Sequence, residues 1–188
     1  MKSRTFIAVA ITDEVRERAR ELMRQLEPVA GDVKWVAAES LHWTLQFLGD
    51  VDDTLIPEIC DCVGGAVGGL EPFDLMVCGA GAFPSADRPR TLWLGANQGA
   101  DDMVSLQAAI ERALGAIGFR GEQRRYVPHL TLGRAGRGRP PRQLANELAE
   151  LADFDAGTML VDEVTVYASQ LRREGPEYRV LGRLPMGS

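Results

Sequence analysis

Two copies of one tetrapeptide limit what this chain can fold into more than any other feature. The chain holds two histidines, and each opens a His-x-Thr-Leu pattern: His42-Trp43-Thr44-Leu45 and His129-Leu130-Thr131-Leu132. In an extended strand, side chains two residues apart lie on the same face. Each copy therefore predicts a strand with a histidine and a threonine on one face and apolar residues on the other. Two such strands are expected to belong to two structural units that face one groove.

The alternation extends beyond the tetrapeptides. In the first copy it predicts one polar face, made of His42, Thr44 and Gln46, and one core face, made of Leu41, Trp43, Leu45 and Phe47. In the second copy, His129 and Thr131 share the polar face, and Leu130 and Leu132 the core face. Pro128 suits the start of a strand or an edge strand, because proline cannot donate to the hydrogen-bond ladder.

Strand-like and helix-like stretches alternate along the whole chain, which indicates an α+β fold. The expected strands span residues 5–11, 33–36, 41–47, 73–83, 90–95, 126–133, 159–168 and 178–184,. The expected helices span residues 13–27, 53–67, 101–117 and 142–151,. Because each half contains strands, helices and one motif, the pattern favours an internal duplication over a solenoid of many short repeats.

Composition excludes several classes of protein. With 188 residues and 45% hydrophobic content, the chain can bury a core as a single bilobal domain over residues 1–188,. The net charge of −6 and a pI near 5.0 argue against a general nucleic-acid coat protein,. Cys60, Cys62 and Cys78 form no Cys-x-x-Cys pair and have no nearby histidine for a zinc site,. These features predict a reduced, cytoplasmic protein with no membrane segment. We also expect a monomer, because both half-sites lie in one chain.

The two histidines suggest acid–base chemistry. An unperturbed imidazole has a pKa of about 6.5, so it exchanges protons near neutral pH. A groove with two imidazoles and two threonine hydroxyls holds the groups that in-line phosphodiester hydrolysis needs without a metal. A metal-dependent hydrolase is disfavoured, since the nearby carboxylates, Asp50, Asp52 and Asp53, lie beyond the expected strand,.

Charge around the second motif indicates an anionic ligand. Between residues 120 and 142 a single acidic residue, Glu122, faces seven arginines: Arg120, Arg124, Arg125, Arg134, Arg137, Arg139 and Arg142. Guanidinium groups match phosphate oxygens bidentately. Arg134, five residues after His129, is therefore the first candidate for a phosphate clamp. Arg125 and Phe47 are candidate contacts of the RNA backbone or a base, and Tyr126 either stacks on a base or packs against a neighbouring strand.

The motifs and their flanks resemble the 2H phosphoesterase superfamily. The resemblance rests on His42-x-Thr44-Leu45 followed by Phe47-Leu48-Gly49, and on Pro128-His129-x-Thr131-Leu132 with Arg134. Within that superfamily the chain is similar to the RNA 2′,3′-cyclic phosphodiesterases, also described as 2′-5′ RNA ligase-like proteins. The resemblance implies two pseudo-symmetric lobes, whose antiparallel sheets line a central groove with the helices outside.

The resemblance also implies a reaction and the role of each residue. The reaction is hydrolysis of a terminal RNA 2′,3′-cyclic phosphate, for example on tRNA fragments, to a 2′-phosphomonoester, without metal or cofactor. His42 would be the general acid, His129 the general base, and Thr44 and Thr131 would hydrogen-bond the nonbridging phosphate oxygens. Members of the family also join RNA ends through a 2′-5′ linkage, the approximate reverse of this reaction.

Two alternatives keep the groove but change its function. A noncatalytic nucleotide- or RNA-binding module would bind phosphate without turnover, and its binding would survive replacement of either histidine. A cyclic phosphodiesterase with the same fold would act on a small nucleotide, such as ADP-ribose 1″,2″-cyclic phosphate. The sequence does not distinguish these substrates from RNA ends.

Overall fold

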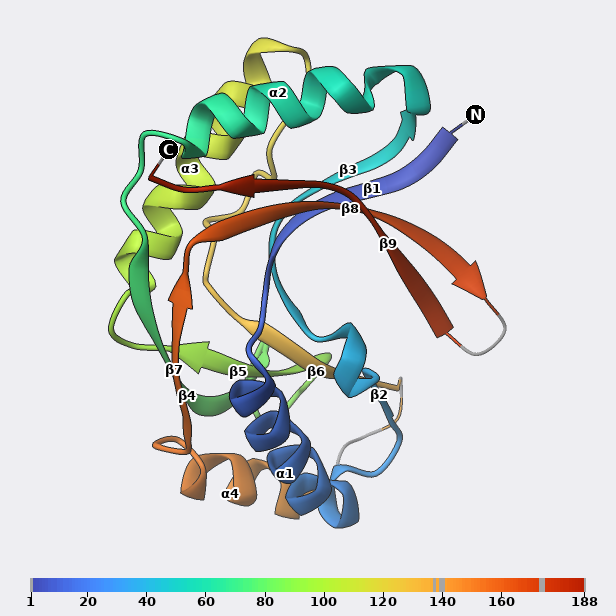
Figure 1. Ribbon diagram of the computed structural model, residues 1–188. Helices are drawn as coiled ribbons and strands as arrows, with labels where there is room; N and C mark the ends of the chain where they lie inside the picture. The colour runs from blue at the N-terminus through green and yellow to red at the C-terminus, as the bar shows by residue number, and fades with distance from the viewer. Residues whose placement is uncertain (1, 137, 139–140, 173–174, 188) are drawn as a thin grey trace.

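One curled antiparallel sheet forms the framework of the protein (Figure 1). The computed structural model describes residues 2–136, 138, 141–172 and 175–187. The sheet runs in the order β7-β4-β5-β6-β3-β1-β8-β9, with β2 paired to β6 as a side branch. Its strands are β1 (Lys2–Ala10), β2 (Val33–Trp35), β3 (His42–Asp52), β4 (Phe73–Phe83), β5 (Thr91–Ala96), β6 (Leu130–Ala135), β7 (Asp155–Val161), β8 (Glu163–Arg172) and β9 (Gly175–Pro185).

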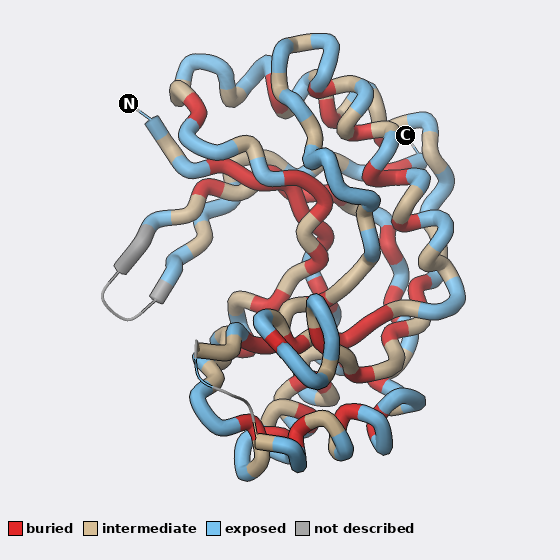
Figure 2. Tube along the Cα trace, turned by 180° about the vertical axis from the view of Figure 1, so that it is seen from behind, coloured by how far each residue is buried: buried red, intermediate tan, exposed pale blue. Residues whose placement is uncertain are grey.

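The sheet divides into two halves that meet where β3 pairs with β6. The upper half in Figure 1 holds β3, β1, β8 and β9 under the helices α2 (Ile56–Val67) and α3 (Ala100–Ala116). The lower half holds β6, β5, β4, β7 and β2 above α1 (Asp13–Ala30) and α4 (Arg142–Glu150). Seen from behind, the trace curves around an open concave side, with buried residues along the junction (Figure 2). The predicted α+β fold with two lobes is confirmed.

The two halves repeat one arrangement of strand, helix and motif strand. In the order β1–α1–β3, the motif strand β3 returns beside β1; in the order β5–α3–β6, the motif strand β6 returns beside β5. Both helices cross to the other half, since α1 packs against β7 and α4, and α3 packs against α2. This correspondence is what an internal duplication predicts.

Helix α1 shows how the sequence encodes these elements. The hydroxyl of Thr12 accepts a hydrogen bond from the Val15 backbone N–H (3.4 Å), which caps the first turn,. The buried residues follow at helical spacing: Val15, Ala19, Leu22, Leu26 and Ala30,. The helix therefore begins where the sequence predicts, and it ends three residues later than expected. Two short 3-10 turns, η1 (Ala38–Ser40) and η2 (Asp53–Leu55), precede β3 and α2.

Two expected strands differ in the structure. Residues 159–168 were expected to form one strand, but the chain makes two, because β7 ends at Val161 in the lower half and β8 begins at Glu163 in the upper half. Because apolar residues lie on both sides of Asp162, the sequence does not indicate that the chain passes from one half to the other there. The strand expected over residues 126–133 begins only at Leu130, and Pro128 lies in the irregular part before it,. Among the helices that the structure describes, none is long and apolar enough to cross a membrane.

Candidate active site

A single antiparallel pair between β3 and β6 brings the two motifs together. Trp43 lies opposite Leu130, and both side chains are fully buried in the core. In an antiparallel ladder the neighbours of a pair are also cross-strand neighbours. His42 is therefore beside Thr131, and Thr44 is beside His129. These four residues are half-buried and alternate with the buried ones, as the sequence predicts.

The backbone fixes both imidazoles in the same way. Nδ1 of His42 lies 2.7 Å from the Ser40 carbonyl oxygen, and Nδ1 of His129 lies 2.8 Å from the Val127 carbonyl oxygen. A carbonyl oxygen only accepts, so Nδ1 carries the proton in each ring. The other nitrogen, Nε2, remains available to a ligand in both motifs.

Aromatic side chains surround His42. Its ring centroid is 4.8 Å from that of Phe6, and it meets Tyr178 edge-on at 5.2 Å. Tyr167 stacks on Phe6 on the same face of the sheet. Burial in this cluster lowers the pKa of His42, while the hydrogen bond to Ser40 opposes that shift,. The buried environment of His42 therefore favours its neutral form,.

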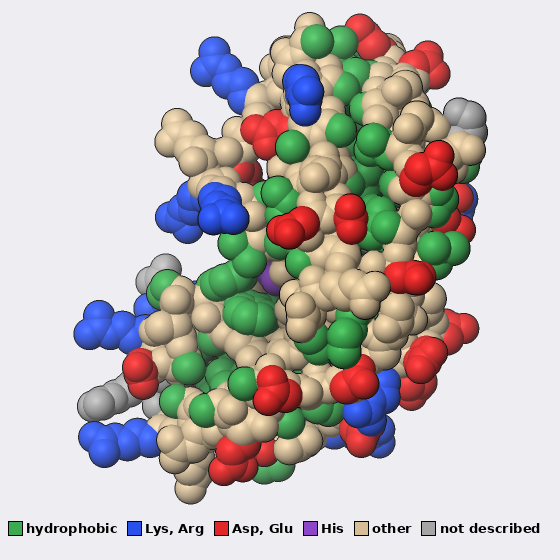
Figure 3. Space-filling view, turned by 90° about the vertical axis from the view of Figure 1, so that its left-hand side faces the viewer, with side chains coloured by type: hydrophobic (Ala, Val, Ile, Leu, Met, Phe, Trp, Pro, Cys, Tyr) green, Lys and Arg blue, Asp and Glu red, His purple; other side chains and the backbone are tan. Residues whose placement is uncertain are grey.

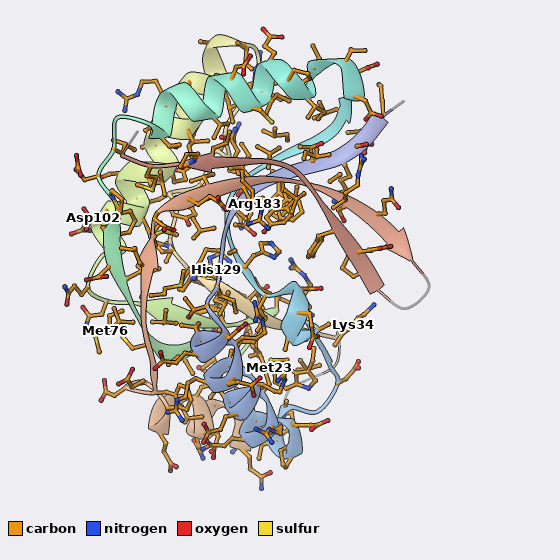
Figure 4. All side chains as sticks on the ribbon, viewed as in Figure 1. Met23, Lys34, Met76, Asp102, His129 and Arg183 are labelled. Carbon is orange, nitrogen blue, oxygen red and sulfur yellow. The ribbon has the colours of Figure 1, made fainter. Side chains whose placement is uncertain are left out.

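His129 has a different aromatic neighbourhood. It meets the ring of Phe83 edge-on at 5.1 Å, and Phe83 in turn lies 5.1 Å from Trp93. Trp93 is the cross-strand partner of Thr131. Figure 4 shows His129 between the two halves of the molecule. The rings on β4 and β5 thus support the second motif from the lower half.

A β-bulge follows the threonine in each motif and changes which later side chains face the groove. In the pairing of β1 with β3, Ala8 lies opposite Thr44 and Ile7 opposite Gln46, which leaves Leu45 unpaired. In the pairing of β5 with β6, Trp93 lies opposite Thr131 and Leu92 opposite Gly133, which leaves Leu132 unpaired. A bulge puts two residues opposite one, so the alternation of faces shifts by one position after it.

The first bulge corrects two of the predicted faces. Gln46 was expected on the polar face, but it lies on the core side with Ile7 and is 3% exposed. Phe47 was expected on the core face, but it lies opposite Phe6, lines the groove and is 50% exposed. The second bulge likewise returns Arg134 to the groove face. Phe47 and Arg134 are equivalent positions, five residues after the respective histidines.

A groove of about 1390 Å³ runs along this face. Figure 3 shows a histidine in the hollow between the two halves. Five of the predicted site residues line the groove: His42, Thr44, Phe47, Thr131 and Arg134. His129 is not one of the lining residues, but its neighbour across the strands, Thr44, lines the groove. Arg125 and Tyr126 do not line the groove either.

Of the described arginines around the second motif, Arg134 lines the groove and the others do not. Arg120, Arg124 and Arg125 lie in the connection between α3 and β6, and Arg142 begins α4. Arg137 and Arg139 lie outside the described residues. Tyr126 packs against the core, and burial raises the pKa of its hydroxyl far above the ordinary value. Packing, rather than base stacking, is the geometry observed for Tyr126.

Sequence reasoning missed several residues that shape the site. Phe6 and Tyr178 enclose His42, and Arg4 and Lys34 add positive charge to the groove lining. The positions of Phe6, Arg4 and Tyr178 depend on the pairing of β1, β8 and β9, and that of Lys34 on the pairing of β2 with β6. No local pattern specifies these pairings. Within the part of the chain that the structure describes, no group of three or more His, Cys, Asp or Glu side chains is arranged to hold a metal ion.

Comparison with known proteins adds independent information. The family model of the 2′-5′ RNA ligase superfamily matches residues 12–173. The chain is 36% identical over 178 residues to the RNA 2′,3′-cyclic phosphodiesterase of Methanothermobacter thermautotrophicus, covering 95% of this chain and 96% of the relative. It is 35% identical over 178 residues to the enzyme of the same name from Thermotoga maritima, covering 95% and 92%. Among solved structures, E. coli LigT complexed with 3′-AMP superposes with a TM-score of 0.78 at 27% identity, covering the whole of both chains.

Proposed function

Since the chain belongs to the 2′-5′ RNA ligase superfamily, we propose that it hydrolyses the 2′,3′-cyclic phosphate at the end of an RNA to a 2′-phosphomonoester. The observation that carries this proposal is the pairing of Trp43 with Leu130. It sets each histidine beside the other motif's threonine, so a phosphate between the strands meets two imidazoles and two hydroxyls. The names of the relatives support the same substrate, and the 3′-AMP complex of LigT supports a nucleotide ligand.

Each motif supplies one half of the reaction. Nε2 of His129 removes a proton from the attacking water, whose oxygen bonds to phosphorus. The bond from phosphorus to the 3′ oxygen breaks, and Nε2–H of His42 gives its proton to that oxygen. The hydroxyls of Thr44 and Thr131 donate hydrogen bonds to the nonbridging oxygens, where negative charge builds up in the transition state. The guanidinium of Arg134 offsets the same charge from the groove wall.

In this mechanism, substrate binding favours the protonated form of His42 that a general acid requires. Burial lowers the pKa of His42, yet a general acid has to carry a proton. A phosphate anion beside the imidazole raises its pKa, because an opposite charge stabilises the protonated form. We therefore expect His42 to take up its proton together with the substrate.

The same groups serve for ligation. If the 5′-hydroxyl of a second RNA replaces water, His129 deprotonates that hydroxyl and His42 protonates the departing 3′ oxygen. The product is a 2′-5′ phosphodiester, and no further group is needed. Neither reaction as we propose it requires a metal.

The test is phosphorus NMR of an oligoribonucleotide that ends in a 2′,3′-cyclic phosphate, with EDTA present. Wild-type protein should produce a 2′-phosphomonoester, and His42→Ala and His129→Ala should each lower the rate by about 10²–10⁴-fold. Loss of activity in EDTA would point to a metal enzyme instead. Tight binding of the cyclic end without turnover would point to a noncatalytic binding module.

A thiol leaving group tests which histidine is the acid. In a substrate whose bridging 3′ oxygen is replaced by sulfur, the departing thiolate needs little help from an acid. His42→Ala should then lose much less activity than on the oxygen substrate, while His129→Ala should lose as much on both. The reverse pattern would exchange the two roles.

A further inference from the structure

Two like charges lie directly opposite each other at the mouth of the groove. Lys34 on β2 is the cross-strand partner of Arg134 on β6, and both side chains are exposed and line the groove. In the described structure, neither side chain forms a salt bridge or a side-chain hydrogen bond. Like charges at directly opposite positions destabilise a sheet. A ligand that places one phosphate at each cation would remove this cost.

A glycine lets this pair form. Gly133 lies opposite Trp35, and a Cβ on Gly133 would come within 2.7 Å of Val33 Cγ1 and 3.0 Å of Trp35 Cε3. Because residue 133 has no side chain, β2 can pack closely on β6. That packing sets Lys34 in register with Arg134 at the groove.

The other charges of the groove do not neutralise the pair. Glu39 lines the groove but forms a salt bridge with Arg20 of α1 (2.9 Å). Arg4 adds a third cation from β1 in the other half, and Glu177 is the second acidic residue of the lining. The groove lining therefore carries an excess of positive charge, although the whole chain has a net charge of −6.

The two cations lie on different strands of the groove wall. Arg134 follows Thr131 on the same strand by three residues, about 10 Å of extended chain. Lys34 lies on the neighbouring side strand, and Figure 4 shows it at the open side of the groove below the β8–β9 arm. Lys34 and Arg134 thus offer two cations on neighbouring strands of the same groove. The groove volume of about 1390 Å³ also exceeds the ~300–1,000 Å³ of most small-molecule pockets.

We propose that Lys34 is a specificity-determining residue that binds the internucleotide phosphate next to the terminal cyclic phosphate. This inference rests on the proposed function, in which Arg134 serves the terminal phosphate. It names the substrate more closely: an RNA end of at least two nucleotides, favoured over a mononucleotide cyclic phosphate. A mononucleotide leaves Lys34 without a phosphate partner.

The chain offers a matched control, because it has two lysines, Lys2 and Lys34. Lys2 lies at the start of β1 and is not one of the groove-lining residues. The binding probes are uridine 2′-monophosphate and the dinucleotide UpU with a terminal 2′-phosphate, neither of which can react further. Calorimetry should show that Lys34→Gln weakens dinucleotide binding about 10-fold and leaves mononucleotide binding unchanged, whereas Lys2→Gln changes neither. The salt dependence of dinucleotide binding should fall by about 0.7 in log–log slope, as for one lost phosphate contact on a single strand.

Chemical protection gives a second readout. Acetylation of the wild-type protein, followed by mass spectrometry, reports on both lysines at once. The dinucleotide should protect Lys34 and leave Lys2 reactive, and the mononucleotide should protect neither. Equal protection of Lys34 by both probes would place it at the terminal phosphate and overturn the proposal.

Turnover separates this proposal from the proposed function. Wild-type protein should hydrolyse the dinucleotide 2′,3′-cyclic phosphate with a higher kcat/KM than the mononucleotide, and Lys34→Gln should remove that preference. Equal losses on both substrates, or no loss on either, would refute the role of Lys34. If neither substrate is hydrolysed, the proposed function fails, and the binding and protection results still decide whether Lys34 reads a second phosphate.

Discussion

Gly81 on β4 provides a quantitative test of how the aromatic support beneath the second motif is packed. A Cβ on Gly81 would lie 2.3 Å from Cζ2 and 2.4 Å from Cη2 of Trp93. Carbon atoms in good contact are about 3.5–4.0 Å apart, so the ring would have to move by more than about 1 Å. Its retreat is limited, because Gly95 and Phe83 lie close to the same ring. We expect Gly81→Ala to lower the free energy of unfolding by about 1–3 kcal/mol, the usual cost of overpacking.

A double-mutant cycle isolates the contact. Gly81 has no positive φ, so alanine itself causes no backbone strain there. In a Trp93→Val background the clash is gone, and Gly81→Ala should be neutral or stabilise by up to about 1 kcal/mol. The loss of stability caused by Gly81→Ala should therefore disappear or change sign in the Trp93→Val background, with a coupling of at least about 1 kcal/mol. Urea unfolding of the four proteins measures it, since 2 kcal/mol shifts the midpoint by about 1 M for a typical slope.

The control is Gly65→Ala in α2, where nothing lies within 4 Å of the added Cβ. That change should stabilise the protein by about 0.5–1 kcal/mol, as alanine does in a helix. A similar loss for Gly81→Ala in both backgrounds, or no loss in the wild type, would refute the position of the Trp93 ring. Because Phe83 joins Trp93 to His129, Gly81→Ala should also reduce turnover of the cyclic phosphate.

Three further results are expected. Burial lowers the pKa of His42 in the folded protein. Between that lowered pKa and the unfolded value of about 6.5, the unfolded chain binds more protons than the folded one, so the free energy of unfolding should fall as the pH falls. His42→Gln should reduce this pH dependence of stability in urea titrations from pH 8 to pH 5. Tyr126→Phe removes a buried hydroxyl that has no hydrogen-bond partner among the described residues, so the free energy of unfolding should stay the same or rise slightly and turnover should not change. A drop in turnover would show that Tyr126 contributes to the active site. Arg134→Ala should raise KM, and Arg134→Lys should bring KM only part of the way back, because lysine cannot bind a phosphate bidentately. A wild-type KM for Arg134→Lys in steady-state kinetics would exclude a bidentate contact between Arg134 and the phosphate.

The faces of the motif residues follow from the sequence, and the faces beyond them do not. Period-two alternation correctly sets His42 and Thr44 against Trp43 and Leu45, because nothing interrupts the strand between them. It fails at Gln46 and Phe47, because the bulge at Leu45 shifts the register by one position,. Leucine has no local feature that marks a bulge. The position of the bulge becomes apparent only when the structures of the two motifs are compared, because each motif has its bulge at the leucine.

The sequence also did not predict where the chain crosses from one half of the sheet to the other. The helices were found to within a few residues, since their apolar spacing and caps are local signals. Val161 and Val164 are both buried, however, so the chain around Asp162 reads as one apolar strand although it leaves one half and enters the other. Tyr178 and Lys34 reach the groove through such long-range pairings. Residues of this kind become candidates only when the strand order is known.

The duplicated motif supplies two equal imidazoles, whereas the proposed reaction needs an acid and a base. The backbone does not separate them, because each Nδ1 binds the carbonyl oxygen two residues earlier. Their neighbours do: at equivalent strand positions, Ala8 lies opposite Thr44 and Trp93 lies opposite Thr131. The strands beside the first motif bury His42 among Phe6 and Tyr178 and lower its pKa,. The two motifs themselves are alike, which explains why the repeat identifies the two histidines but does not say which is the acid.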